Sequence, residues 1–148
     1  MIEFAGNLWD YFPQEWICVT TNGYVKSNGE AVMGRGCARE AAMRFSELPM
    51  ILGDSIGRFG NHLAYLRHHI LAFPVKHNWW EGADLRLITR SLQELDLAKA
   101  RLGFERVFLP RPGCGNGGLD WELVRPLCEK HGDWLAVISK PIDYTTTG

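Results

Sequence analysis

Short apolar segments alternate with amphipathic segments along most of this chain, and this alternation limits the fold more than any other feature. The apolar segments are rich in β-branched and aromatic residues, as strands are, and cover residues 2–4, 15–21, 62–76, 105–110 and 134–140. Because the segment 62–76 is interrupted at Arg67-His68-His69, it is expected to form a hairpin of two strands. Strands that alternate with helices predict an α/β fold, and the hairpin predicts a mixed sheet rather than a wholly parallel one.

The amphipathic segments repeat their apolar residues with the spacing of a helix. The clearest is 83–102, where Leu85, Ile88, Leu92 and Leu95 share one face. Further helices are expected over 37–48, with Pro49 as the residue that ends it, over 50–59 and over 121–131. We expect these helices to cover the faces of the sheet.

The composition indicates one globular domain over residues 1–148, with residues 142–148 as a frayed tail. The chain has 148 residues, of which 46% are hydrophobic and 22% charged. Its net charge of −1 gives no support to nucleic-acid binding through a basic surface. No segment has the roughly 18 apolar residues of a membrane span, and the first ten residues do not resemble a signal peptide. A cytoplasmic monomer that contacts no membrane is expected.

The cysteines and histidines show no metal-site spacing. The four cysteines at positions 18, 37, 114 and 128 form no CxxC pair, so we expect reduced thiols and no structural zinc. The five histidines also have no ligand spacing. No metal ion is therefore predicted.

Two glycine-containing loops each follow an apolar strand and lead into a helix. The first is MGRG at 33–36, and the second runs from Gly113 to Gly118 and enters a helix near Trp121. Such loops let backbone amides approach phosphate groups, and the helix dipole favours negative charge there. No Lys-Ser/Thr pair follows, so the second loop is not a P-loop, and the position of the motif does not fit a dinucleotide-binding GxGxxG. The two loops are expected to face each other across a cleft at the carboxyl ends of the strands.

The chain resembles the macrodomain family, whose members bind ADP-ribose. The resemblance rests on AGNLWD at 5–10, VTTNGYVKSNGEAVMGRGCA at 19–38, FPVK at 73–76 and PRPGCGNGGLDW at 110–121. It is nearest to the branch of antitoxins that remove ADP-ribose from DNA and to related bacterial and phage proteins. It implies a three-layer α/β/α sandwich with a mixed, largely parallel central sheet, no cofactor, and ADP-ribose or an ADP-ribosylated protein or DNA as partner.

The resemblance also implies which residues would contact ADP-ribose. Asn7 and Leu8 stand where the family binds adenine, although Asn7 replaces the usual aspartate. The two glycine loops would enclose the diphosphate and the distal ribose, and Thr21 and Ser139 complete the binding set. The loop residues in this set are Met33, Gly34, Arg35, Gly36, Gly113, Cys114, Gly115, Asn116, Gly117 and Gly118.

Two residues are candidates for catalysis. Asn22 matches the family asparagine that positions the distal ribose, although an ordinary Asn-Gly turn would also explain it. Lys76 matches the lysine that reaches the anomeric carbon in the DNA-directed branch. Apolar neighbours would lower its pKa and favour the nucleophilic neutral amine.

Nearby residues have simpler interpretations. Asp120 is expected to cap a helix, His77 to lie on the surface, and Trp79 and Trp80 to pack against the sheet edge rather than to shield the ribose.

Three functions remain open from the sequence. The chain could be a hydrolase that removes ADP-ribose from a macromolecule, including DNA, through Asn22 and Lys76. It could instead be a phosphatase acting on ADP-ribose 1″-phosphate, or a module that binds ADP-ribose without turnover. The Asn7 replacement favours the last two, whereas Lys76 favours the first.

Overall fold

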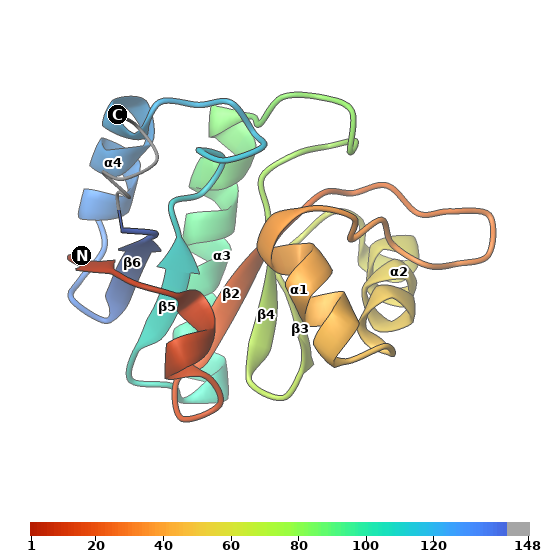
Figure 1. The fold of residues 1–148 in the computed structure, drawn as a ribbon, viewed down its shortest axis with the longest axis horizontal. Helices are drawn as coiled ribbons and strands as arrows, with labels where there is room; N and C mark the ends of the chain where they lie inside the picture. Colours follow the sequence, from red (N-terminus) through yellow and green to blue (C-terminus); the bar gives the residue numbers. More distant parts are fainter. Residues whose placement is uncertain (142–148) are drawn as a thin grey trace.

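A six-stranded sheet in the order β1-β6-β5-β2-β4-β3 forms the middle layer of the computed structural model, which describes residues 1–141 (Figure 1). The strands are β1 (Ile2–Ala5), β2 (Trp16–Thr21), β3 (Ala64–Arg67), β4 (Ile70–Pro74), β5 (Val107–Pro110) and β6 (Leu135–Ser139). Every neighbouring pair is parallel except β3 and β4. The predicted hairpin and the mixed, largely parallel sheet are therefore confirmed.

Helices cover both faces of this sheet (Figure 1). On one face lie α1 (Gly36–Arg44), α2 (Leu48–Phe59) and the short 3-10 helix η1 (Leu8–Tyr11), and on the other lie α3 (Leu85–Leu102) and α4 (Trp121–Glu129). The side chains of β2 alternate between the two resulting cores: Ile17 and Val19 pack with α1 and α2, whereas Cys18 packs with α3 and α4. The α/β/α sandwich is confirmed.

The helix α3 matches its prediction because the local signals agree with the packing. Asp84 caps its first turn by accepting a hydrogen bond from the Arg86 amide, and Gly103 ends it in the left-handed conformation. Its apolar face is buried through Ile88, Leu92 and Leu95. This helix is one wall of the core that contains Cys18, and it supports the loops described below.

The helix predicted over 37–48 is wrong at its carboxyl end. The helix α1 stops at Arg44, and the Phe45 amide donates to the Ala41 carbonyl at 2.9 Å. A second helix, α2, then begins at Leu48 with Pro49 in its first turn. A proline fits there because the first amides of a helix have no carbonyl partner. Pro49 therefore starts a helix instead of ending one.

The predicted frayed tail, residues 142–148, lies outside the described residues. No helix among residues 1–141 is long and apolar enough to cross a membrane. All four cysteines are free thiols.

Candidate functional site

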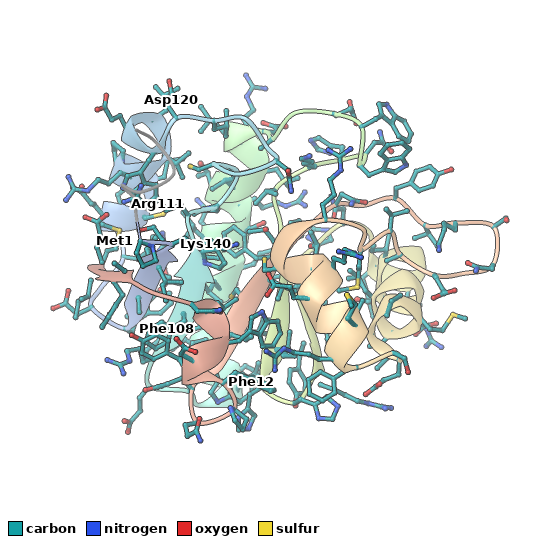
Figure 2. All side chains as sticks on the ribbon, in the orientation of Figure 1. Met1, Phe12, Phe108, Arg111, Asp120 and Lys140 are labelled. Atoms are coloured by element: carbon teal, nitrogen blue, oxygen red, sulfur yellow. The ribbon has the colours of Figure 1, made fainter. Side chains whose placement is uncertain are left out.

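A cavity of about 780 Å³ opens at the carboxyl ends of the five parallel strands. Each strand supplies residues to the wall where it ends or just beyond, as the positions of Asn7, Thr21, Lys76, Pro110 and Ser139 show. This is the edge at which open parallel sheets bind ligands, and the volume suits a nucleotide-sized molecule. Arg111, Asp120 and Lys140, which are labelled in Figure 2, also line it.

The first wall is the segment from Asn22 to Gly36. The Asn22 side chain accepts a hydrogen bond from the Tyr24 amide at 2.9 Å and donates one to the Val32 carbonyl at 3.0 Å. It therefore joins the two ends of the segment and holds its shape. One Nδ2 hydrogen and one Oδ1 lone pair remain for a ligand.

The glycine-containing end of this wall is open. Arg35 occupies the N-cap position of α1 without a side-chain cap hydrogen bond, so no cap side chain covers the first amides of the helix. A side chain at Gly34 would meet only a Val32 methyl group at 4.0 Å. The missing side chain at Gly34 is therefore not required by packing.

The second wall is the loop from Gly113 to Gly118, and it is tightly packed. The Leu119 amide donates to the Gly113 carbonyl at 2.9 Å, and the Ala83 amide donates to the Gly117 carbonyl at 3.0 Å. A Cβ at Gly117 would lie 2.5 Å from the Gly113 carbonyl oxygen. Gly115 differs, because a Cβ added there would meet no atom within 4 Å, and this residue faces the cavity.

Lys76 lies between the two walls with only 9% of its surface exposed. Its carbonyl accepts a hydrogen bond from the Asn61 side chain at 2.9 Å, which fixes the backbone just beyond β4. Burial lowers the pKa of Lys76, and the positive charge of Arg35 lowers it further. A larger share of its amine is therefore neutral, and nucleophilic, than for a lysine in water.

The opposite end of the cavity contains Asn7. Its Oδ1 accepts a hydrogen bond from the Trp9 amide at 3.0 Å and so caps η1. The Nδ2 group has no partner among the described residues, so Asn7 presents a donor to the cavity, where a carboxylate would present a second acceptor.

Two buried polar atoms of the cavity residues have no hydrogen-bond partner among residues 1–141. They are Thr21 Oγ1 and Trp9 Nε1, in side chains that are 4% and 7% exposed. Buried polar groups are almost always paired in proteins, so these two atoms are exceptions for which the described residues supply no partner.

The cavity cysteines are poor nucleophiles. Burial raises the pKa of Cys37, whose Sγ lies 3.4 Å from the Thr20 amide, and it also raises the pKa of Cys114. Both thiols therefore stay protonated at neutral pH.

Comparison with known proteins agrees with this architecture. No family model matches the chain. The macrodomain of Mycobacterium tuberculosis DarG superposes with a TM-score of 0.77 at 26% identity, over 96% of this chain and 97% of that one. The chain has the macrodomain fold. A DarTG of Thermosipho africanus solved in complex with ADP-ribose superposes with a TM-score of 0.73 at 23% identity, over 93% of this chain and 40% of that one.

Curated sequences show the same relationship. A DNA ADP-ribosyl transferase–DNA ADP-ribosyl glycohydrolase fusion protein of Thermosipho africanus is 25% identical over 70% of this macrodomain and 33% of the fusion protein. The DNA ADP-ribosyl glycohydrolase of Mycobacterium tuberculosis is 41% identical over 38% of this chain and 16% of that protein. This macrodomain thus spans a third or less of the curated relatives it matches.

The structure brings together nearly all residues predicted for the macrodomain site. Every predicted residue lines the cavity except Gly118, which turns with a φ of 77° just outside it. Residues that the sequence did not single out also line the wall, among them Trp9, Cys37, Glu40 and Lys140. Lys140 follows β6, so its place at the carboxyl edge of the sheet was a usable signal. Trp9 has no such signal, because an apolar residue after a strand indicates only core packing.

Two interpretations of neighbouring residues need correction. Asp120 occupies the N-cap position of α4, but its side chain makes no cap hydrogen bond and lines the cavity instead. Trp79 and Trp80 do not pack against the sheet edge: they are 44% and 58% exposed, and Trp79 lines the cavity. The loop that carries them is held by backbone contacts, so the indoles are not needed to fill a core. His77 lies on the surface as predicted, with Nε2 2.8 Å from an Asp84 carboxylate oxygen.

Proposed function

We propose that this macrodomain binds ADP-ribose in the cavity and removes ADP-ribose from DNA. The relatives named above as DNA ADP-ribosyl glycohydrolases and the DarTG solved with ADP-ribose support both parts of the proposal. The observation that carries it is the buried Lys76, which lies with a lowered pKa on a cavity lined by both glycine loops.

From one end of the cavity to the other, successive parts of the wall suit the adenine, the diphosphate and the distal ribose of ADP-ribose. The bare backbones at Gly34 and Gly115 leave space for the diphosphate between the loops. Asn7, at one end, would donate to the adenine base. Asn22, at the other end, would position the distal ribose with its remaining amide hydrogen, next to Lys76.

Lys76 would then attack the anomeric carbon of the distal ribose. The amine lone pair forms a new C–N bond, and the bond to the DNA base breaks with its electron pair and a proton going to the base. The ribosyl-lysine opens to an imine, and water adds to the imine carbon. Expulsion of the amine regenerates Lys76 and releases ADP-ribose, so no external oxidant or cofactor is needed.

The substitution Lys76→Ala tests this chemistry. Turnover of ADP-ribosylated DNA should fall by at least about a thousandfold, while the affinity for ADP-ribose stays within about threefold, because the amine acts in the chemical step. Calorimetry gives the affinity, and borohydride added during turnover should trap a covalent adduct on the wild type but not on the variant. Lys130→Ala is the control, since Lys130 is exposed at the end of α4 outside the cavity.

Other outcomes would replace the proposal. Full activity of Lys76→Ala would exclude attack by the lysine. If the intact protein binds ADP-ribose but leaves ADP-ribosylated DNA unchanged, the macrodomain is a binding module. Phosphate release from ADP-ribose 1″-phosphate without action on DNA would make it a phosphatase.

A further inference from the structure

Three aromatic rings meet on the surface beside the Lys76 end of the cavity. Trp80 contacts Tyr24 and Trp79 in edge-to-face geometry, with ring centroids 5.3 and 5.4 Å apart. Trp79 also lines the cavity, so this aromatic platform of Tyr24, Trp79 and Trp80 is continuous with the candidate site. The rings come from two separate loops, one after β2 and one after β4.

Both loops are held in place without help from these rings. After β4, the Asp84 amide donates to the Val75 carbonyl at 2.9 Å, and His77 pairs with the Asp84 carboxylate at 2.8 Å. The Gly23 amide donates to the His77 carbonyl at 3.0 Å and ties the two loops together. The indoles therefore stay exposed on a rigid support, although burying them would be favourable. Exposed aromatic groups that are fixed in this way are typical of a binding surface.

The chemistry of the platform favours a flat, uncharged partner. The acidic groups beside it already have partners: Asp84 pairs with His77, and Glu81 accepts a hydrogen bond from Asn78 at 2.5 Å. The rings themselves offer apolar, uncharged faces, which suit a flat base rather than a phosphate. Nucleobases stack on such faces with little dependence on sequence.

We propose that the aromatic platform stacks the nucleobase next to the ADP-ribosylated nucleotide in an unpaired DNA strand. This rests on the proposed function, because the modified nucleotide must reach Lys76 from the platform side of the cavity. Since paired bases already stack on one another, a duplex would have to give up that stacking before its base could lie on Trp80. The platform thus selects substrates with an unpaired neighbouring base.

Turnover of two substrates by Trp80→Ala tests the inference. One substrate is a single-stranded oligodeoxynucleotide with one ADP-ribosylated base, and the other is the same ADP-ribosylated nucleoside without neighbours. The KM for the oligonucleotide should rise about tenfold, equivalent to about 1.4 kcal/mol, whereas the KM for the nucleoside should not change. Trp80→Phe should keep most of the wild-type preference for the oligonucleotide over the nucleoside. Leu97→Ala, which removes a side chain 68% exposed on α3, is the control and should change neither value.

A second measurement does not depend on turnover. Unmodified single-stranded DNA should quench the tryptophan fluorescence of the wild type, and the quenching should be largely lost in Trp80→Ala. If the macrodomain fails to act on DNA at all, this titration still decides whether the platform stacks bases. Absence of quenching, or equal KM changes for both substrates, would overturn the inference. An effect of Trp80→Ala on ADP-ribosylated peptides alone would also overturn it and would indicate a protein-binding surface.

Discussion

The two glycine loops of the cavity look alike in sequence, but single glycines within them differ in why a side chain is absent. In the loop Met33–Gly36, a side chain at Gly34 would meet no atom closer than 4.0 Å. In the loop Gly113–Gly118, a side chain at Gly117 would meet the Gly113 carbonyl oxygen at 2.5 Å and the Ala83 Cβ at 2.7 Å. Gly115, two residues before Gly117, is as open as Gly34.

The difference separates glycines that shape a loop from glycines that leave room for a ligand. Gly117 lets the second loop fold back on itself and accept the Ala83 amide, which holds the connection between β4 and α3. Gly34 and Gly115 have no such task, yet both line the cavity. Their missing side chains are therefore best explained by a bound group, and the substitutions below test this distinction.

The largest effect is expected for Gly117→Ala. The new methyl group would overlap backbone atoms that cannot move without breaking the loop, so the free energy of unfolding should fall by about 2–3 kcal/mol. Urea denaturation measures this change. Gly115→Ala is the matched control and should remain within about 0.5 kcal/mol of the wild type. Equal losses in both variants would remove the distinction between the two kinds of glycine.

A smaller effect, on binding alone, is expected for Gly115→Val and Gly34→Val. Wild-type affinity for ADP-ribose should be micromolar, about −8 kcal/mol, and each valine should weaken it at least about tenfold by occupying the space between the loops. Calorimetry measures affinity, and unfolding curves should show unchanged stability. AMP, which lacks the second phosphate and the distal ribose, should bind the wild type far more weakly than ADP-ribose. Normal ADP-ribose affinity in Gly115→Val would show that this loop is only a turn.

The smallest effect is expected for Arg35→Gln, which changes the charge of the first loop without filling it. Because the Arg35 charge helps to lower the pKa of Lys76, its removal should raise that pKa. If the neutral amine is the nucleophile, single-turnover rates increase with pH, and their midpoint should move to higher pH in this variant.

The shift should be modest because burial is the larger cause of the lowered pKa. Arg39→Gln, on the exposed surface of α1 outside the cavity, should leave the midpoint unchanged. If the midpoint stays at the wild-type pH in Arg35→Gln, the charge of Arg35 does not influence the reacting amine of Lys76.

Much of the site could be predicted because it lies where strands end. The motif residues Asn7, Asn22 and Lys76 each follow a strand recognisable from its apolar residues, and the carboxyl ends of parallel strands meet at one edge. The order of strands and helices along the chain is therefore enough to predict which edge of the sheet carries the cavity. The exposure of Trp79 and Trp80 did not, since an aromatic residue near a strand most often packs in a core.

The sequence by itself determined the alternation of strands and helices, the caps of α3 and the position of each glycine, because these depend on residues close together in the chain. Only the tertiary structure decided that Gly117 is packed whereas Gly115 is open, and that Lys76 is buried. Each of these depends on atoms from distant segments, such as Ala83 against Gly117 and Asn61 beside Lys76. Packing between such segments sets burial and exposure, and local propensity contains no information about it.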